Sequence, residues 1–472
     1  MINKQTKIVA TISNKNCSVD FLRKLHDAGM DVVRLNTAHQ TPEESSEVVA
    51  KVRATSQRLA IMVDTKGPEI RTRYFAEGIS LPVKKGQLVK MAGSAKGESA
   101  PGLMLVDYPR FAAELSKGSQ ILIDDGELAL EVVSKKKDHV VVKVMNEGVI
   151  KGKKSVNVPG VSLTLPSLSI KDKTFIDWAM AEKIDFIAHS FVRDDKDVLA
   201  IRKLLDAKKS PIKIIAKIEN RAGVENIDKI IAVADGIMVA RGDLGVEIPM
   251  EEVPFVQKLL IRKCVEQGKS VITATQMLHS MIQNPRPTRA EVSDVTNAML
   301  DGTDAVMLSG ETAYGDHALA AVRTMATIAC KVDVMKSLVY STRIRPEHRL
   351  ADYLSKAAVK MAEELGAKEI ILSDVSDYSA EMVASYRPSV PVFVKCVNET
   401  RARQLALSYG IYAHCLPKEE FNNGMLRKML TDLVRKGKLK SKDLIVYLSG
   451  EQSSGLVGDQ LEICQVAKYI KK

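Results

Sequence analysis

Aromatic residues are scarce in this sequence of 472 residues, which has one tryptophan and an aromatic content of 4%. The lysine-rich runs at 135–137 and 151–154 are not interleaved with aromatic residues, as a stacking platform for single-stranded nucleic acid requires. The formal net charge is +11. This charge leaves open both a nucleic-acid partner and a basic cleft for phosphorylated metabolites, although a charge run is most often only a solvated face.

Cysteine is also rare, and long apolar runs are absent. The six cysteines are scattered at positions 17, 264, 330, 396, 415 and 464, with no CxxC pair. This pattern argues against a disulfide framework and a thiolate zinc site, and it predicts buried, reduced thiols. No apolar run approaches the roughly 18 residues of a membrane helix, and the first residues lack the apolar segment of a secretory signal. A cytoplasmic protein is expected.

Eight short apolar runs recur along the chain, each ending in a polar residue and followed by a helical pattern. Their length predicts buried parallel strands in βα units. Most of them start about 30 residues after the preceding one, but 126 residues separate the starts at positions 60 and 186. The pattern predicts a (β/α)8 TIM barrel with an insertion after its third strand. The runs are residues 7–11, 32–36, 60–64, 186–190, 213–217, 236–240, 270–274 and 305–309.

The segment within the long gap and the end of the chain have residue patterns that differ from that of the barrel. Short apolar runs at 120–124, 128–133 and 140–144, joined by glycine and aspartate turns, predict a small antiparallel β domain over residues 73–157. Its two connections to the barrel suit it to act as a lid. The barrel then comprises residues 1–72 and 158–336. Residues 337–472, where apolar runs alternate with helical stretches, are predicted to form a separate α/β domain.

Polar residues collect at the carboxyl ends of the predicted barrel strands, where barrel enzymes hold their active sites. Because alternate strand residues point the same way, Lys217 and Glu219 are expected to share a face. Arg34 and Asn36 are expected to do the same, as are Arg241 and Asp243. The full set of strand-end residues is Arg34, Asn36, Asp64, Lys66, Lys217, Glu219, Arg241, Asp243, Thr275, Ser309 and Glu311.

This set brings cations, carboxylates and hydroxyls together, without a Ser–His dyad or a cysteine nucleophile. Glu219 and Asp243 suit a hard divalent ion such as Mg2+, beside which lysine and arginine would neutralise phosphoryl oxygens. The alternative is that these residues are only structural ion pairs that cap the barrel. For any single pair the structural interpretation is favoured, but for the whole set an active site is favoured. No Walker or Gly-x-Gly-x-x-Gly sequence identifies ATP or NAD. The histidines at 39, 189 and 279 are not expected to be catalysts.

Five segments at these strand ends resemble the signatures of the pyruvate kinase family. They occur in the family's order, and the insertion falls in the family's place. The resemblance implies an α/β fold, a (β/α)8 TIM barrel with an inserted small β-barrel lid domain and a C-terminal α/β regulatory domain. The segments are MVDTKGPEIRT at 62–72, IIAKIEN at 214–220, MVARGDLG at 238–245, ATQML at 274–278 and MLSGETA at 307–313.

The resemblance implies phosphoryl transfer from phosphoenolpyruvate to ADP, followed by protonation of the enolate to pyruvate, the final step of glycolysis. Lys217 matches the lysine that stabilises the moving phosphoryl group and the enolate, and Arg34 an arginine that contacts the phosphoryl group. Glu219 and Asp243 match the carboxylates that hold the substrate-bound Mg2+. The other implied roles are substrate binding by Ala240, Arg241, Gly242 and Thr275, nucleotide binding by Arg71, Lys154 and His39, and proton delivery through Thr275 and Ser309.

The resemblance also implies K+ at Asn36, Asp64 and Thr65. The family's further ligand is a serine in the segment Arg-Leu-Asn-Phe-Ser-His, which here reads RLNTAH over residues 34–39, so Ala38 lacks the hydroxyl. Glu69 occupies the position whose acidic residue accompanies K+ dependence in the family. K+ is therefore still expected, with water or a backbone oxygen in place of the missing hydroxyl.

Two other departures from the family concern ligands. Ser13-Asn14 replaces a usual Gly-Pro pair near where the family binds adenosine, which puts the local nucleotide contacts in question. In the C-terminal domain, the segments SDVSDYS at 373–379 and SGEQSSG at 449–455 carry three acids where the family binds an activating sugar phosphate. Each carboxylate would repel a bisphosphate by roughly 1 kcal/mol or more at close range. Weak or no activation by fructose 1,6-bisphosphate is expected, and a sugar monophosphate is left open.

Two alternatives compete with this interpretation. Another barrel that handles phosphoenolpyruvate or pyruvate, such as a metal-dependent lyase, would need neither ADP nor Arg71 and Lys154 beside a lid. A catalytically silent, nucleic-acid-binding relative is suggested only by the net charge, and the presence of Lys217, Glu219 and Asp243 argues against it. The expected partners are phosphoenolpyruvate, ADP and further copies of the chain in a homotetramer, with no nucleic acid and no membrane.

Overall fold

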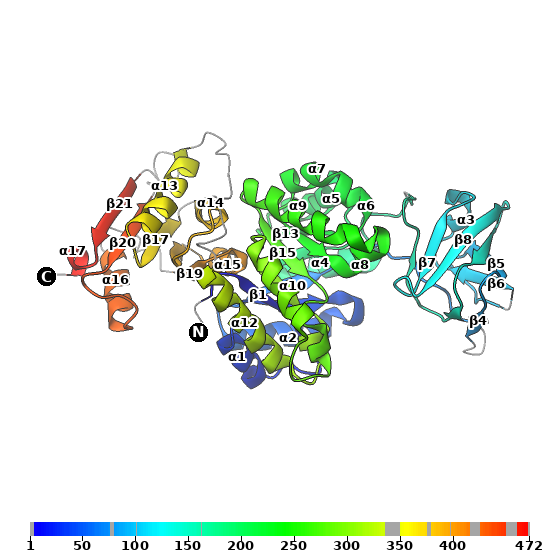
Figure 1. Cartoon of the computed structure of the whole chain (residues 1–472), viewed down its shortest axis with the longest axis horizontal. Helices are drawn as coiled ribbons and strands as arrows, with labels where there is room; N and C mark the ends of the chain where they lie inside the picture. Colours follow the sequence, from blue (N-terminus) through cyan, green and yellow to red (C-terminus); the bar gives the residue numbers. More distant parts are fainter. Residues whose placement is uncertain are drawn as a thin grey trace.

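Eight parallel strands close into a barrel at the centre of the molecule (Figure 1). The computed structural model describes residues 4–75, 80–100, 102–161, 163–335, 350–374, 379–396, 398–415, 425–449 and 460–470. The order around the barrel is β1-β16-β15-β14-β13-β12-β3-β2. These strands coincide with the eight apolar runs, so the predicted TIM barrel is confirmed. They are β1 (Lys7–Thr11), β2 (Val32–Asn36), β3 (Ala60–Asp64), β12 (Phe186–His189), β13 (Lys213–Ile218), β14 (Gly236–Ala240), β15 (Ser270–Ala274) and β16 (Ala305–Leu308).

Each barrel strand is buried on both faces, which explains its continuous apolar sequence. Val9, Met62 and Ile272 pack with one another inside the barrel. Their neighbours Ile8 and Val271 belong to the larger core between the strands and the surrounding helices. The helices of the barrel are α1 (Val19–Asp27), α2 (Pro42–Thr55), α4 (Ile170–Ala181), α5 (Asp195–Ala207), α6 (Arg221–Glu225), α7 (Ile227–Val233), α8 (Arg241–Glu247), α9 (Val253–Glu266), α10 (Arg289–Leu300), α11 (Gly310–Ala313) and α12 (Ala318–Met335).

The insertion after β3 forms its own β structure at one end of the molecule (Figure 1). A six-stranded sheet has the order β11-β7-β8-β9-β5-β6, and β4 pairs with β10. Every strand pair except β5–β6 is antiparallel. The elements are β4 (Leu81–Val83), β5 (Leu88–Gly93), β6 (Leu103–Val106), α3 (Phe111–Glu114), β7 (Gln120–Ile123), β8 (Leu128–Lys135), β9 (Val140–Val144), β10 (Gly148–Ile150) and β11 (Val156–Asn157).

Two local features lie where the inserted domain faces the barrel. Arg71 and Ser155 form an antiparallel bridge, so the two connections between lid and barrel run side by side. The turn between β7 and β8 has positive φ at Asp124 and Asp125 (56° and 55°), a conformation that aspartate tolerates better than most residues. Both aspartates line the cavity described below.

The C-terminal domain is a five-stranded sheet flanked by helices at the opposite end of the molecule from the lid (Figure 1). Its strand order is β19-β18-β17-β20-β21, and only β21 runs antiparallel to its neighbour. The elements are α13 (Leu350–Glu364), β17 (Glu369–Asp374), α14 (Ser379–Ser385), β18 (Val392–Cys396), α15 (Glu399–Gln404), β19 (Ile411–Cys415), α16 (Met425–Arg435), β20 (Leu444–Ser449), β21 (Gln460–Gln465) and α17 (Ala467–Ile470).

Buried ion pairs join this domain to the amino ends of the barrel strands. Arg403 Nε donates to Asp185 Oδ1 at 2.7 Å, immediately before β12. Arg387 donates to Asp304 at 2.9 Å, immediately before β16. The C-terminal domain is therefore docked on the face of the barrel opposite to the strand ends that carry the predicted site.

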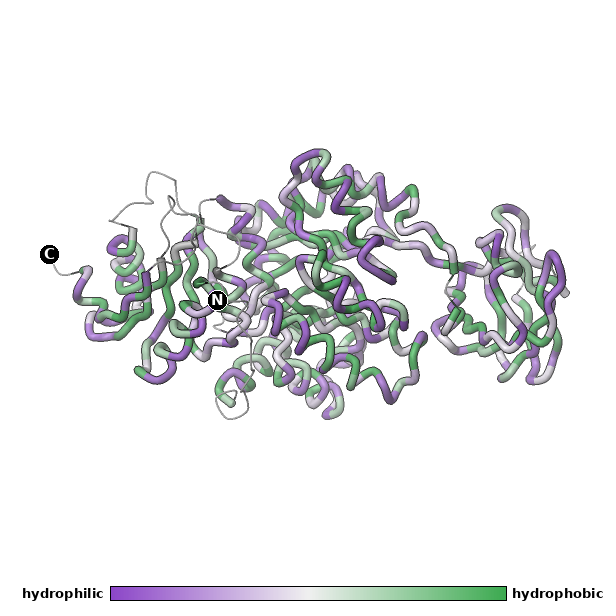
Figure 2. Tube along the Cα trace, turned by 90° about the horizontal axis from the view of Figure 1, so that it is seen from above, coloured by the Kyte–Doolittle hydropathy of each residue, from purple (hydrophilic) through white to green (hydrophobic). Residues whose placement is uncertain are grey.

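Apolar stretches run through the barrel and both flanking domains and alternate along the chain with hydrophilic ones (Figure 2). Among the described residues, no helix is both long and apolar enough to cross a membrane. The prediction of buried thiols is wrong for Cys415, which is exposed on an edge strand, and Cys330 is only half-buried. The acidic segments at 373–379 and 449–455 fall largely outside the described residues.

Candidate active site

Lys217 is the centre of a buried polar cluster at the carboxyl end of β13. Its ammonium lies 3.0 Å from Asp64 Oδ1 and 2.9 Å from Glu219 Oε1. It also donates to Ser190 Oγ at 2.8 Å. Arg34 Nε reaches the other oxygen of Asp64 at 2.7 Å. The strand ends of β2, β3, β12 and β13 thus bring two cations, two carboxylates and a hydroxyl together.

The pKa values of this cluster follow from burial and charge. Burial alone would lower the pKa of Lys217, but the carboxylates of Asp64 and Glu219 outweigh it and raise that pKa. Burial would raise the pKa of Asp64, but Arg34 and Lys217 hold it below its usual value. Lys217 and Asp64 are therefore charged at neutral pH.

Glu219 and Asp243 show the opposite effect. Burial raises the pKa of Glu219 to about 7, and it also raises the pKa of Asp243. The negative charges of Asp243 and Asp64 add to the shift of Glu219 beyond what Lys217 offsets. Lys217 offsets this negative charge only in part at the buried Glu219 and the half-buried Asp243, and a divalent cation with oxygen ligands would offset more of it.

Asp243 and Arg241 differ from the predicted arrangement. β14 ends at Ala240, so both residues lie in α8 and do not share a face of a strand. Asp243 lines the cavity. The Arg241 guanidinium instead donates to Thr275 O at 2.7 Å and pairs with Asp294 of α10, also at 2.7 Å. The strand does not extend to Asp243, as the prediction required, because α8 begins directly after Ala240.

Thr275 and Gly242 contact each other directly. Gly242 N donates to Thr275 Oγ1 at 2.8 Å, and the hydroxyl donates to Ala274 O at 2.6 Å. Thr275 has φ of 68°, unusual for a β-branched residue, which marks a turn held by its surroundings. Gly242 therefore lies beside the hydroxyl of Thr275, at the junction of α8 with the loop after β15.

Ser309 ends the barrel sequence just after β16. Its N–H donates to Glu311 Oε2 at 2.7 Å. Glu311 Oε1 accepts the N–H of Leu278 at 3.1 Å, so one buried carboxylate ties the loop after β15 to the start of α11. Ser309 and Thr275 are thus held at the ends of adjacent strands, β16 and β15.

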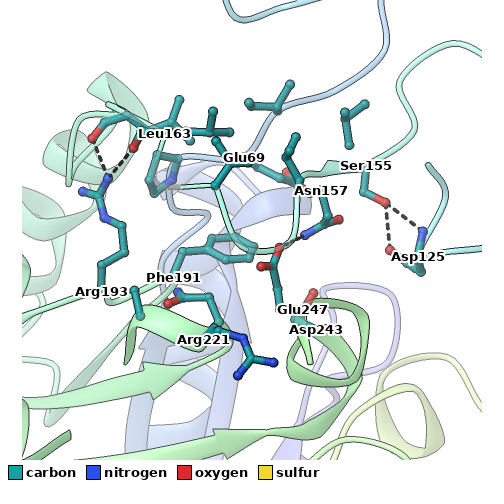
Figure 3. A pocket seen from close by; sticks show the side chains of 18 of the residues that line it. Glu69, Asp125, Ser155, Asn157, Leu163, Phe191, Arg193, Arg221, Asp243 and Glu247 are labelled. Carbon is teal, nitrogen blue, oxygen red and sulfur yellow. Dashed lines mark hydrogen bonds between the residues drawn. The ribbon is translucent and has the colours of Figure 1, made fainter. Parts of the chain in front are cut away.

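A cavity of about 750 Å³ lies between the inserted domain and the ends of β2, β3, β12 and β13 (Figure 3). Four predicted site residues line it, namely Asn36, Arg71, Lys154 and Asp243. The Arg71 guanidinium is held by Glu69, with Nε 2.8 Å from Oε2, and by Lys153 O at 2.7 Å. Lys154 pairs with Asp124 at 2.7 Å. His39 lies in the 3-10 turn Thr37–His39, and its side chain is outside the described part of the chain.

The lid contacts the barrel across this cavity. Asn157 of β11 donates to Glu247 Oε1 of α8 at 3.0 Å, a hydrogen bond that crosses the cavity in Figure 3. Arg193, after β12, donates to the backbone carbonyls of Leu163 and Leu165 at 3.3 and 3.0 Å. These contacts fix the segment that returns from the lid to the barrel.

The predicted K+ ligands are brought together at the ends of β2 and β3. Asn36 and Asp64 are direct partners in the strand register. Thr65 O accepts the Ser190 hydroxyl at 2.7 Å. Thr37 Oγ1 donates to Asp64 O at 2.8 Å, so a hydroxyl is present next to Ala38. These residues supply oxygen atoms, and the two carboxylate oxygens of Asp64 already bind Lys217 and Arg34.

Sequence reasoning missed several residues of this site. Ser190 ends the fourth apolar run, and the polar end of that run was the available signal. Glu247 lies one helical turn after Asp243, and Arg193 follows Ser190 by three residues, but neither spacing is distinctive in the sequence. Among the described residues, no group of three or more His, Cys, Asp or Glu side chains could hold a metal ion by itself. A metal here would need oxygens from a substrate or from water.

A family model described as "Pyruvate kinase, barrel domain" matches residues 3–322, and one described as "Pyruvate kinase, alpha/beta domain" matches residues 352–460. A protein named "Pyruvate kinase" from Borreliella burgdorferi is 45% identical over 97% of this chain and 96% of its own length.

Two further similarities extend this result. A "Pyruvate kinase" from Geobacillus stearothermophilus is 46% identical over 95% of this chain and 78% of its own length. A crystal structure of a pyruvate kinase from Cryptosporidium parvum superposes with a TM-score of 0.92 at 34% identity, covering 98% of this chain and 96% of that chain.

Proposed function

Because the chain belongs to the pyruvate kinase family, whose members transfer the phosphoryl group of phosphoenolpyruvate to ADP, we propose that Lys217 and Arg34 are the cations that stabilise this transfer. The observation that carries the proposal is the buried ammonium of Lys217, held by Asp64, Ser190 and Glu219 at 2.8–3.0 Å. A charged group fixed in place before the reaction needs no reorganisation when negative charge moves.

Lys217 would act on both stages of the reaction. Its ammonium offsets charge on the phosphoryl group as this group leaves phosphoenolpyruvate, and then charge on the enolate oxygen that remains. Arg34, fixed by Asp64 at 2.7 Å and by Thr11 Oγ1 at 2.9 Å, would contact the phosphoryl oxygens. Protonation of the enolate carbon completes pyruvate, and we assign the proton's delivery to the hydroxyls of Thr275 and Ser309.

The substrate carboxylate would bind where α8 begins. The backbone of Ala240, Arg241 and Gly242 forms this junction, and Thr275 Oγ1 lies 2.8 Å from Gly242 N. The guanidinium of Arg241 is engaged with Asp294 and Thr275 O. We therefore assign Arg241 a positioning role: it holds the loop after β15 against α8, while backbone groups face the substrate.

ADP would occupy the cavity between barrel and lid. Arg71 and Lys154 line it from the two connections of the lid and carry positive charge toward the phosphates, with His39 as a further nucleotide contact. The lid also excludes water, which limits hydrolysis of both phosphorylated substrates.

The family needs a divalent cation and K+. We propose that Glu219 and Asp243 hold Mg2+, which fits one buried and one half-buried carboxylate, both with raised pKa values. When bound, Mg2+ would neutralise substrate oxygens. Asn36, Asp64 and Thr65 would hold K+. The register pairing of Asn36 with Asp64 supports this assignment.

Three further proposals concern the context of the reaction. We propose that the enzyme works as a homotetramer in the cytoplasm, as family resemblance implies, at the final step of glycolysis. We also propose weak or no activation by fructose 1,6-bisphosphate, because of the acidic residues at 373–379 and 449–455. Light scattering on the purified chain tests the tetramer. Titration of phosphoenolpyruvate with and without the bisphosphate tests the activation.

The central experiment measures pyruvate formation from phosphoenolpyruvate and ADP with Mg2+, with and without K+. Lys217→Met should lower kcat by at least roughly 10²- to 10³-fold, the effect of removing one preorganised charge. The exposed lysine variant Lys229→Met, on α7, is the matched control and should keep full activity. Retained turnover in Lys217→Met, with an unchanged thermal melt, would contradict the assigned role.

A further inference from the structure

Cys396 and Cys415 end two neighbouring parallel strands of the C-terminal sheet. Cys396 is the last residue of β18 and Cys415 the last of β19, and the strand register pairs the two directly. Neither residue belongs to the site of phosphoryl transfer. That site lies at the other end of the barrel from the C-terminal domain (Figure 1).

The two side chains project from the same face of the sheet. Cys396 and Val394 belong to one apolar core, against which Ala413 also packs. Phe393 belongs to the core on the opposite face, where Tyr412 packs. Because side chains alternate along a strand, Cys415 shares its face with Ala413 and therefore with Cys396.

The spacing of paired strands suits a disulfide. Neighbouring strands lie about 4.8 Å apart, and disulfides join Cα atoms separated by roughly 4.4–6.8 Å. Disulfides prefer Cβ atoms roughly 3.5–4.5 Å apart, a little closer than the spacing of neighbouring strands. Closure therefore needs a small approach of the two side chains. Cys396 and Cys415 are the last pair of the register that the structure describes between these two strands.

The two thiols differ in access. Cys396 is fully buried, whereas Cys415 is exposed at the sheet edge, since β19 is an outer strand. An oxidant in solution therefore reaches Cys415 first. Burial and the carboxylate of Glu399 raise the pKa of Cys415, against the opposing effect of Arg403 and Lys395. Its thiolate fraction is small at neutral pH and grows as the pH rises.

We propose that Cys396 and Cys415 form a redox-active dithiol that a two-electron oxidant such as hydrogen peroxide converts into a cross-strand disulfide. The Cys415 thiolate attacks one peroxide oxygen, the O–O bond breaks, and a sulfenic acid and one water are formed. The Cys396 thiolate then attacks the sulfenic sulfur, and the hydroxyl leaves as a second water. Two thiols and one hydrogen peroxide thus give one disulfide and two waters.

The experiment treats the reduced full-length protein with hydrogen peroxide, alkylates the remaining thiols and maps the peptides without reduction. We expect a peptide pair linked through Cys396 and Cys415 and two fewer alkylated thiols per chain. Dithiothreitol should reverse both changes. Because the Cys415 thiolate is the nucleophile, the linkage should form faster at pH 8.5 than at pH 7.

Two variants sharpen the test. Cys415→Ser should abolish the linkage and leave Cys396 alkylatable, while Cys464→Ser, a buried cysteine of β21, should leave the linkage intact. Over-oxidation of Cys415 to a sulfinic acid with Cys396 still alkylatable would overturn the proposal. A Cys415 disulfide between two chains, or no oxidation of either thiol, would also overturn it. The peptide map of the unaltered protein decides the matter even if a variant fails to fold.

Discussion

At the scale of single residues, His189 shows how a buried polar group acts against stability. It ends β12, its side chain is fully buried, and neither ring nitrogen has a hydrogen-bond partner among the described residues. Burial lowers the pKa of its imidazole to about 4. The ring is therefore neutral in the folded protein over the physiological range, and its polar nitrogens have lost water without gaining partners.

Replacing His189 with leucine should raise the free energy of unfolding by about 1–3 kcal/mol, the cost of an unsatisfied buried polar group. Chemical denaturation at pH 7 measures it. The exposed His279→Leu is the control and should change stability little. A loss of stability in His189→Leu of similar size would show that the imidazole packs better than leucine at this position.

The lowered pKa of His189 also predicts that the free energy of unfolding depends on pH. Unfolded histidine titrates near 6.5, and folded His189 near 4, so the unfolded state binds the proton first as the pH falls. Above pH 6.5 the histidine is neutral in both states, and its titration does not change the free energy of unfolding. As the pH falls from 6.5 toward 4, protonation of the unfolded state lowers the free energy of unfolding by up to about 1.4 kcal/mol per pH unit. His189→Leu should lose less stability than the unaltered protein between pH 6.5 and pH 4. Parallel profiles would contradict the assigned pKa.

Ala38 makes a second prediction at this scale. Ala38→Ser restores the hydroxyl that the family's K+ site carries, beside Asn36 and Thr37. One added oxygen ligand worth about 1 kcal/mol should lower the half-saturating K+ concentration roughly fivefold. The rise in melting temperature with added K+ gives a readout independent of activity. Ala54→Ser, on an exposed position of α2, is the control, and an equal response of both variants would contradict the assigned site.

At the scale of elements, the caps of the helices fix how the site's loops are held. Thr288 and Glu291 form a capping box at the start of α10. The Glu291 carboxylate also accepts the N–H of Ser280 at 2.6 Å, in the loop that follows β15. One side chain therefore begins a helix and anchors the segment that carries Thr275.

Glu291→Ala should lower the free energy of unfolding by about 2 kcal/mol, because hydrogen bonds to a carboxylate are stronger than neutral ones. Thr288→Ala removes only the cap and should cost about 1 kcal/mol. Thermal melts rank the two variants. The control is Glu266→Ala at the exposed end of α9, which should be nearly neutral. Equal losses for Glu291→Ala and Thr288→Ala would mean that the bond to Ser280 contributes little.

At the scale of the whole molecule, ion pairs hold the C-terminal domain on the barrel. Arg387 donates twice to Gly302 O, at 2.6 and 3.0 Å, and to Asp304 at 2.9 Å. Asp304 also accepts the N–H of Tyr409 at 3.0 Å and that of Val271 at 3.0 Å. The amino ends of β15 and β16 are thereby tied to the C-terminal domain.

Arg387→Gln should cost about 3–5 kcal/mol, because Asp304 is left buried without its cation. In calorimetry, the unfolding transitions of the C-terminal domain and the barrel should lie further apart in temperature in this variant than in the unaltered protein. The control Arg435→Gln breaks an exposed pair with Asp432 and should change little. Unchanged transitions in Arg387→Gln would show that the other ion pairs suffice for docking.

Much of this fold is determined locally, and so the sequence alone predicts it. The barrel strands are buried on both faces, so their apolar runs are continuous and end at polar residues. The predicted run at 270–274 coincides with β15, whereas the sequence singles out no apolar run at β19 (Ile411–Cys415). β19 is a half-exposed edge strand in which polar and apolar residues mix, and such a segment lacks a distinctive local pattern.

The chemistry of the site was decided partly by the sequence and partly by the tertiary structure. Strand-end position and family motifs singled out Lys217 and Asp243. They did not reveal that Ser190 accepts a hydrogen bond from Lys217, or that the Arg241 side chain pairs with Asp294 of α10. These contacts join residues far apart in the chain. Their geometry, and the pKa shifts caused by burial and neighbouring charges, exist only once the barrel has closed and excluded water from the strand ends.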